Sequence, residues 1–96
     1  MATARLEQAA VETWQASHPG WRVEADALLK RFSFKDYPST LAFVMRLAFV
    51  AEARGHHPDL VVRYGAVEVS WTTHDAGGLT DLDLAQAERT DELLAP

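Results

Sequence analysis

Three of the four histidines lie in two short segments of the chain, and their spacing suits acid–base chemistry. His56 and His57 are adjacent, and His74 follows eighteen residues after His56. Imidazole titrates close to neutral pH, so neighbouring histidines can donate a proton at one atom of a substrate and accept one at another. Glu52 precedes His56 by four residues, which places both on one helix face if the helix extends that far. We therefore expect proton transfer on a small neutral substrate.

The same histidines admit two other interpretations, a metal site and a purely structural cluster. A metal site is disfavoured because the pattern contains no His-x-His or His-x3-His pair and the chain has no Cys. Histidines near the ends of helices and strands often only satisfy backbone groups, so the structural interpretation stays open. A serine hydrolase is disfavoured because neither Ser33 nor Ser70 lies in a sequence that resembles a nucleophile elbow.

A predicted β-hairpin brings the two histidine segments together. If Gly65-Ala66 is a two-residue loop, apolar residues face each other on one side of the ribbon and an Arg faces a Glu on the other. If the same register continues to the base of the hairpin, two histidines lie directly opposite each other. The Cβ atoms of such a pair are about 4.5–5.5 Å apart. The expected pairs are Leu60 with Trp71, Val62 with Val69, Tyr64 with Val67, Arg63 with Glu68, and His57 with His74.

Two helices and a first hairpin are expected before the histidine segments. Residues 21–34 alternate around a turn at 24–27, and a helix then opens with Asp36 as its N-cap and ends at Gly55. Residues 5–16 have the spacing of a short amphipathic helix. Its inward face would consist of Leu6, Ala9, Ala10, Thr13 and Trp14.

The last helix completes the predicted fold. Thr80 is its expected N-cap, with Asp83 as the second residue of a capping box, and Leu82 and Ala85 would lie on one side. The element order is then α-β-β-α-β-β-α. This order predicts an α+β fold, with a four-stranded antiparallel sheet and the helices packed on one face.

The composition is that of a single globular domain, which we expect to span residues 1–96. Apolar residues make up 48% of the chain and charged residues 24%, both near the globular average. The net charge of −5 argues against a direct nucleic-acid partner. The first residues lack the apolar run of a signal peptide, and no apolar stretch approaches the roughly 18 residues of a membrane span. We expect a cytoplasmic protein with no membrane partner.

The second predicted helix is apolar nearly all round. From Leu41 to Ala51, only Arg46 is polar. A helix of this kind must be covered on more than one side, and the single sheet of so small a domain covers one side only. We therefore predict a homodimer or homotetramer with this helix at or near the interface.

The two histidine segments also belong to longer motifs. Residues 52–59 read E-A-R-G-H-H-P-D, and residues 72–80 read T-T-H-D-A-G-G-L-T, with Asp83 following. Upstream, Gly20-Trp21 and the sequence F-S-F-K-D-Y at 32–37 extend the pattern. Together these motifs resemble the pterin-4a-carbinolamine dehydratase family over about residues 20–85. The His-His-Pro motif with a third histidine at this spacing is specific to that family.

The resemblance implies a lyase that removes water from 4a-hydroxytetrahydropterin and yields quinonoid dihydropterin, in tetrahydrobiopterin recycling. It also implies a functional link to phenylalanine hydroxylation, since aromatic amino acid hydroxylases release this carbinolamine. The reaction needs a proton donor and a proton acceptor, so no metal or other cofactor is expected. By resemblance, His56 and His74 are the general acid/base candidates beside the 4a-hydroxyl, and His57 contacts the ring system.

The resemblance implies further contacts with the pterin. They are Trp21, Glu52, Pro58, Thr73, Asp75 and Ala76. Glu52 would accept two parallel hydrogen bonds from the guanidine-like edge of the ring, and Trp21 would line or stack on its flat face. The plainer interpretations are a solvated helix residue for Glu52 and core packing for Trp21. Asp83 is expected to do no more than cap its helix, and His18 to be an uninvolved surface residue.

A non-catalytic module of the same fold is the alternative function. Some members of the resembled family act as dimerisation cofactors for a homeodomain transcription factor, and others assist the assembly of enzymes. Non-enzymatic relatives tend to lose members of the histidine set. All three histidines are present here, which favours the enzyme.

Overall fold

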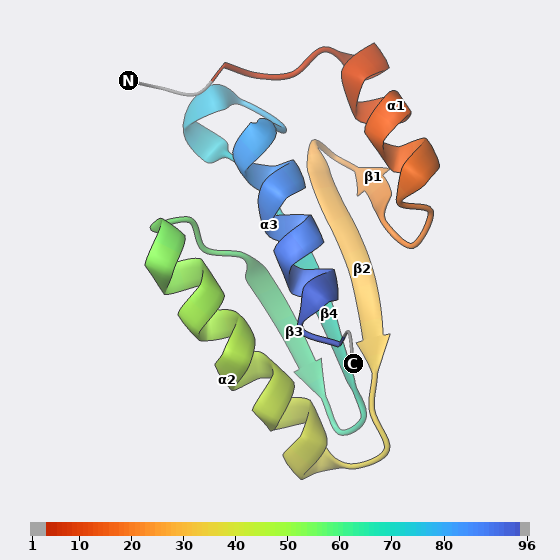
Figure 1. Cartoon of the computed structure of the whole chain (residues 1–96), viewed down its shortest axis with the longest axis vertical. Coiled ribbons are helices and arrows are strands. Elements are labelled where there is room, and N and C mark those ends of the chain that lie inside the picture. The colour runs from red at the N-terminus through yellow and green to blue at the C-terminus, as the bar shows by residue number, and fades with distance from the viewer. Residues whose placement is uncertain (1–3, 95–96) are drawn as a thin grey trace.

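The structure, a computed structural model, describes residues 4–94 and contains the predicted order of elements (Figure 1). The strands pair antiparallel in the order β1-β2-β4-β3, which confirms the α+β class. Figure 1 shows α3 in front of β4, with α2 along β3 and α1 beside β1. The elements are α1 (Gln8–Ser17), β1 (Arg22–Glu24), β2 (Ala27–Ser33), α2 (Tyr37–Arg54), β3 (Asp59–Arg63), β4 (Ala66–Trp71), a 3-10 turn (His74–Ala76) and α3 (Asp81–Glu92).

Helix α1 begins later than the sequence pattern predicts. The backbone N–H of Leu6 donates to the carbonyl of Leu79 at 2.8 Å, which fastens the residues before the helix to the loop before α3. Glu7 is the N-cap and makes no side-chain capping bond. Val11 is the buried residue of the helix, and of the predicted face only Leu6 and Trp14 pack against the core. Ala9, Ala10 and Thr13 are exposed.

The first hairpin turns where the sequence predicts. Arg22 pairs with Leu29 and Glu24 with Ala27, which leaves Ala25 and Asp26 as a two-residue turn. Their φ angles are 48° and 63°, the left-handed values that a tight hairpin turn requires at both central positions. Ala25 adopts this conformation at a steric cost that glycine would not have.

The second hairpin has a register that differs from the predicted one by two residues. Its loop is Tyr64-Gly65 rather than Gly65-Ala66. Side chains in a strand alternate with a period of two, so a shift of two residues leaves each one on its predicted face. The hydrophobic pattern could not distinguish these two registers. The observed pairs are Asp59 with Ser70, Leu60 with Val69, Val61 with Glu68, Val62 with Val67, and Arg63 with Ala66.

The polar pairs predicted for this hairpin are therefore wrong. Glu68 lies opposite Arg31 of β2, with Nη1 and Oε1 3.8 Å apart, rather than opposite Arg63. Because β3 begins at Asp59 and β4 ends at Trp71, the described strands do not pair His57 with His74.

Helix α2 has the caps that the sequence predicts. The backbone N–H of Ser39 donates to Oδ1 of Asp36 at 2.8 Å. Hydrogen bonds from the side chain and backbone of Ser39 lower the pKa of Asp36. At the other end, Gly55 adopts a φ of 64°, and its N–H donates to carbonyls of the last turn.

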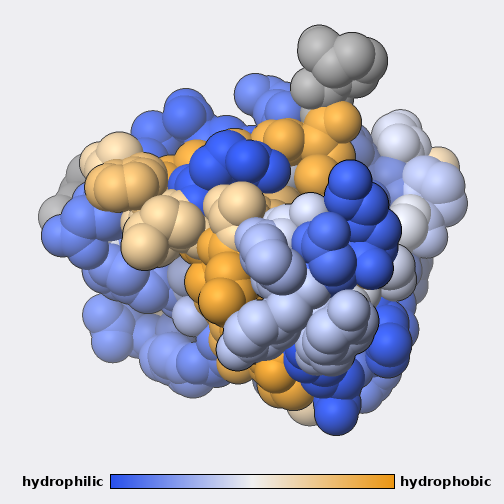
Figure 2. All heavy atoms as spheres, turned by 90° about the horizontal axis from the view of Figure 1, so that it is seen from below, coloured by the Kyte–Doolittle hydropathy of each residue, from blue (hydrophilic) through white to orange (hydrophobic). Residues whose placement is uncertain are grey.

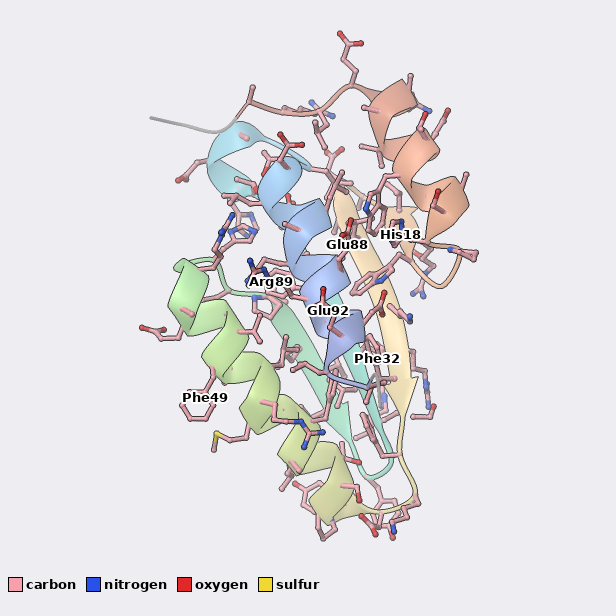
Figure 3. The ribbon with its side chains drawn as sticks, in the orientation of Figure 1. His18, Phe32, Phe49, Glu88, Arg89 and Glu92 are labelled. Atoms are coloured by element: carbon pink, nitrogen blue, oxygen red, sulfur yellow. The ribbon has the colours of Figure 1, made fainter. Side chains whose placement is uncertain are left out.

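One side of α2 carries large apolar side chains that nothing in the described chain covers. Leu41, Met45 and Phe49 are 41%, 60% and 70% exposed and lie four residues apart, so they form a stripe, here called the α2 stripe. Figure 3 shows Phe49 pointing away from the body of the molecule. Figure 2, which views the end where α2 begins, shows apolar surface between hydrophilic residues there.

The core lies between the sheet and the helices, and its α3 side is largely polar. Phe43 and Leu47 of α2 pack against buried residues of β2 and β4 such as Phe32 and Val69. On α3, the predicted side with Leu82 and Ala85 is only half-buried. The buried residues of α3 are instead Asp83, Gln86, Ala87 and Thr90. A polar inward face carries no hydrophobic signal, which explains why the pattern missed it.

Within residues 4–94, none of the helices combines the length and the apolar character that a membrane crossing demands.

Candidate active site

A buried carboxylate holds the first histidine of the pair. Nε2 of His56 lies 2.6 Å from Oδ1 of Asp83, in the first turn of α3. The carboxylate is fully buried, and the imidazole is 13% exposed. The imidazole also stacks on Trp71, with ring centroids 5.6 Å apart and planes 17° from parallel. The end of α2, the start of α3 and the end of β4 therefore meet at this one ring.

Asp83 also connects His56 to the segment that carries His74. The hydroxyl of Thr73 and the backbone N–H of Thr80 donate to Oδ2 of Asp83 at 2.7 and 2.9 Å. Thr73 directly precedes His74 in the chain. The two histidine segments thus meet through a buried carboxylate, and not through opposed strands. The capping box of Thr80 and Asp83 is confirmed, but capping is only part of what Asp83 does.

Glu52 contacts a different histidine from the one its spacing predicts. Its Oε1 lies 2.9 Å from Nε2 of His57. The predicted proximity to His56 fails because α2 ends at Arg54 and Gly55 turns the chain. The side chains of His57 and Glu52 are 60% and 80% exposed, so water screens the pair and leaves it free to rearrange.

His74 is exposed and opens the 3-10 turn between β4 and α3. Its carbonyl accepts from the N–H of Gly77, whose φ of 74° closes the turn. Asp75 is exposed beside it, and Ala76 is half-buried. On the other loop, Pro58 is half-buried directly after His57. Apart from Glu52 on α2 and Trp21, the residues that the sequence assigns to the site lie in the two loops that the His56–Asp83 contact and its Thr73 hydrogen bond connect.

Trp21 lies in the core. The side chain is 1% exposed, and the indole N–H donates to Oδ2 of Asp91 at 2.9 Å. Asp91 also accepts from Nζ of Lys30 at 2.7 Å. Asp91 lies eight residues beyond Asp83 on α3, or about 12 Å along the helix axis. Core packing accounts for this position, and a contact between Trp21 and a substrate stays a prediction.

His18 lies outside the histidine site and joins α1 to α3. Its ring stacks on Trp14 at 3.9 Å, and Nδ1 lies 2.8 Å from the carbonyl oxygen of Trp14. Nε2 is 3.7 Å from Oε2 of Glu88, and Figure 3 shows the two side chains near each other. The indole N–H of Trp14 donates to the same carboxylate at 2.7 Å. His18 is therefore half-buried in a helix contact, rather than a free surface residue.

Residues 4–94 contain no metal cluster, and two surface hollows have walls that include none of the site histidines. Among residues 4–94, no group of three or more His, Cys, Asp or Glu is arranged to hold a metal ion. A hollow of about 340 Å³ lies between α1 and the β1–β2 turn, with Arg5, Val11 and Val23 in its walls. Another, of about 400 Å³, lies between α2 and α3 beside Phe49 and Arg89.

Comparison with known proteins agrees with this geometry. A family model described as pterin 4 alpha carbinolamine dehydratase matches residues 4–93. A protein of Chloroflexus aurantiacus named "putative pterin-4-alpha-carbinolamine dehydratase" is 43% identical over 90 residues, covering 94% of this chain and 97% of that protein. A protein of the same name from a Roseiflexus species is 45% identical over 94 residues, covering 98% of this chain and 100% of its own.

Two solved structures share the fold. A transcriptional coactivator/pterin dehydratase from Brucella melitensis has a TM-score of 0.88 at 28% identity, covering 93% of this chain and 97% of that one. A pterin dehydratase-like protein identified as a RuBisCO assembly factor in the alpha-carboxysome has a TM-score of 0.66 at 29% identity, covering 78% and 87%. With a family model that spans nearly all of the chain and relatives above 40% identity, this chain belongs to the pterin-4a-carbinolamine dehydratase family.

Proposed function

We propose that this chain catalyses the dehydration of 4a-hydroxytetrahydropterin to quinonoid dihydropterin by histidine acid–base catalysis. The observation that carries the proposal is the His56–Asp83 contact at 2.6 Å, next to the loop that bears His74. A half-buried imidazole held in place by a buried carboxylate is a positioned proton-transfer group. Family membership supplies the substrate class.

The reaction needs two proton transfers and nothing else. The C4a–O bond breaks with its electron pair, and a protonated imidazole donates a proton so that the hydroxyl leaves as water. The N5–H bond gives its electrons to a new N5=C4a double bond, and a neutral imidazole accepts the proton. One histidine thus becomes neutral while another becomes charged, and the net change is loss of one water molecule.

His56 and His74 are the proposed proton-transfer pair, and His57 with Glu52 the proposed contact for the ring edge. The exposed Glu52 carboxylate can turn from His57 toward the N3–H and 2-amino donors of a pterin, which match two carboxylate oxygens. Pro58, Thr73, Asp75 and Ala76 flank these groups on the same two loops and complete the proposed substrate contacts.

An oligomer is part of the proposal. The α2 stripe exposes a row of large apolar side chains that a second copy of the chain would bury. We expect a homodimer or homotetramer. We also expect a cytoplasmic location and a functional link to an aromatic amino acid hydroxylase, since the hydroxylase reaction forms this substrate.

The test is a direct dehydration assay. Synthetic 4a-hydroxytetrahydropterin is mixed with the purified chain, and formation of quinonoid dihydropterin is followed against the slow uncatalysed reaction. The proposal predicts a rate that is proportional to enzyme concentration. A rate equal to the uncatalysed one at every enzyme concentration would contradict it and favour a non-catalytic interaction module.

A further inference from the structure

We infer that Asp83 is a positioning residue that fixes His56 with its proton on Nε2 and thereby makes Nδ1 the atom that exchanges protons with the substrate. The inference rests on the proposed function, because it assigns an atom to the proton transfer at that same site. It also gives Asp83 a task beyond capping α3.

Helix capping uses only one of the two carboxylate oxygens. The backbone N–H of Thr80 and the hydroxyl of Thr73 both donate to Oδ2 of Asp83. Oδ1 takes no part in the cap and faces Nε2 of His56. An Asp that served the helix alone would leave Oδ1 with water or a backbone donor, so the histidine contact is a separate feature.

The hydrogens of this network can be assigned from the donors present. The hydroxyl of Thr80 accepts from the N–H of Leu82, and its own hydrogen is free for the Thr73 oxygen 2.9 Å away. The single hydroxyl hydrogen of Thr73 then goes to Asp83. Every partner of Oδ2 is therefore a donor. An ionised carboxylate only accepts, so Nε2 of His56 must carry the proton of the 2.6 Å contact.

The other nitrogen of His56 is left free by this arrangement. Among residues 4–94 its Nδ1 has no hydrogen-bond partner, while stacking on Trp71 restricts rotation of the ring. In neutral His56, Nδ1 is then an acceptor. In the imidazolium it is a donor, and the carboxylate of Asp83 compensates the positive charge. Both states that a general acid or base needs are thus presented through the same atom.

His57, in the same site, has a carboxylate partner that is exposed to water. Its carboxylate partner Glu52 is 80% exposed, while the side chain of Asp83 is completely buried. Water competes for the hydrogen bond of the exposed pair, so the tautomer of His57 is not fixed in the same way. The two adjacent histidines are therefore distinguished by the burial of their partners.

Asp83→Asn is the decisive variant, because it keeps the hydrogen bonds that cap α3 and should reverse the tautomer of His56. The amide oxygen can still accept from Thr80 and Thr73, and a neutral amide can serve at the N3 position of a capping box. The amide NH2 then faces Nε2 of His56 and only donates, so the proton of neutral His56 moves to Nδ1. Asp36→Ala, which removes the cap of α2 far from the site, is the control for loss of stability alone.

Two measurements are made on wild type, Asp83→Asn and Asp36→Ala. Imidazole ¹⁵N NMR should find neutral His56 protonated on Nε2 in wild type and Asp36→Ala, and on Nδ1 in Asp83→Asn. In the dehydration assay, Asp83→Asn should lower kcat by about 10²–10⁴-fold with KM changed less than about threefold. Asp36→Ala should leave both constants near the wild-type values.

Three results would overturn the inference. They are a wild-type His56 protonated on Nδ1, an unchanged tautomer in folded Asp83→Asn, or a kcat for that variant within about threefold of wild type. If Asp83→Asn does not fold, the wild-type tautomer alone decides. A wild type without dehydratase activity would refute the proposed function, and the NMR comparison would still decide whether Asp83 sets the tautomer.

Discussion

Asp83 Oδ1 and His56 Nε2 are 2.6 Å apart although 27 residues separate them in the chain. The same carboxylate begins α3 and holds the imidazole at the end of α2. The α3 N-terminus and the site therefore depend on the same carboxylate, and changes at this contact should affect stability and activity together.

The two adjacent histidines should differ in their effect on stability. His56→Ala leaves Oδ1 of buried Asp83 without its donor, and an unsatisfied buried group costs about 1–3 kcal/mol. His57→Ala removes only an exposed pair and should change the free energy of unfolding by less than about 1 kcal/mol. Urea unfolding of both variants measures the difference. Equal losses of free energy in the two variants would contradict this prediction.

Trp21→Phe separates a core role from a substrate contact. The variant keeps an aromatic ring but removes the indole N–H that donates to Asp91, so the free energy of unfolding should fall by about 1–3 kcal/mol. Since the side chain is 1% exposed, KM should stay at the wild-type value. Urea unfolding and steady-state kinetics test this together. A raised KM with unchanged stability would instead support the stacking role implied by the family.

Charge on the α2 stripe should dissociate the predicted oligomer. Met45→Glu and Phe49→Glu place a carboxylate where a partner subunit would bury apolar surface. Sedimentation at micromolar concentration should find an oligomer for wild type and a monomer for the double variant. Glu7→Gln, on the exposed residue before α1, is a control that should not change the assembly. A wild type that is already monomeric contradicts the prediction.

The Asp36 cap should contribute stability in a pH-dependent way. Hydrogen bonds from Ser39 lower the pKa of Asp36 in the folded chain, so its contribution is complete above the ordinary pKa and is lost as the pH falls through the lowered value. Asp36→Ala should therefore melt at a lower temperature than wild type at about pH 7, and the gap should close toward about pH 2. A gap in Tm that is independent of pH would show that the charge of Asp36 is irrelevant.

Local signals in the sequence were sufficient for the element order and the caps. Asp36 with Ser39, the left-handed Gly55 and the Thr80–Asp83 capping box depend on neighbours within a few residues, and all three are present as predicted. The register of the second hairpin was not determined in this way. The contact of Gly65 with Phe34 fixes its loop, because the Phe34 N–H donates to the Gly65 carbonyl at 2.8 Å. That information lies in the residue that follows β2, outside the hairpin itself.

The site was predicted in its residue types but not in its contacts. The histidines and Glu52 could be selected because their types and spacing carry chemistry. The partner of His56 could not, since capping already explains an Asp three residues after Thr80 and a polar inward face of α3 carries no hydrophobic signal. The end of α2 at Arg54 likewise moves Glu52 from His56 to His57.

The most direct test of the central claim is the turnover of His56→Ala and His74→Ala in the dehydration assay, with His18→Ala as a control. His18 is a histidine of the same chain in a contact away from the site. If His56 and His74 transfer the protons, each alanine variant loses about 10²–10⁴-fold in kcat while His18→Ala keeps the wild-type rate. Near-wild-type rates for both His56→Ala and His74→Ala, in folded protein, would contradict the account.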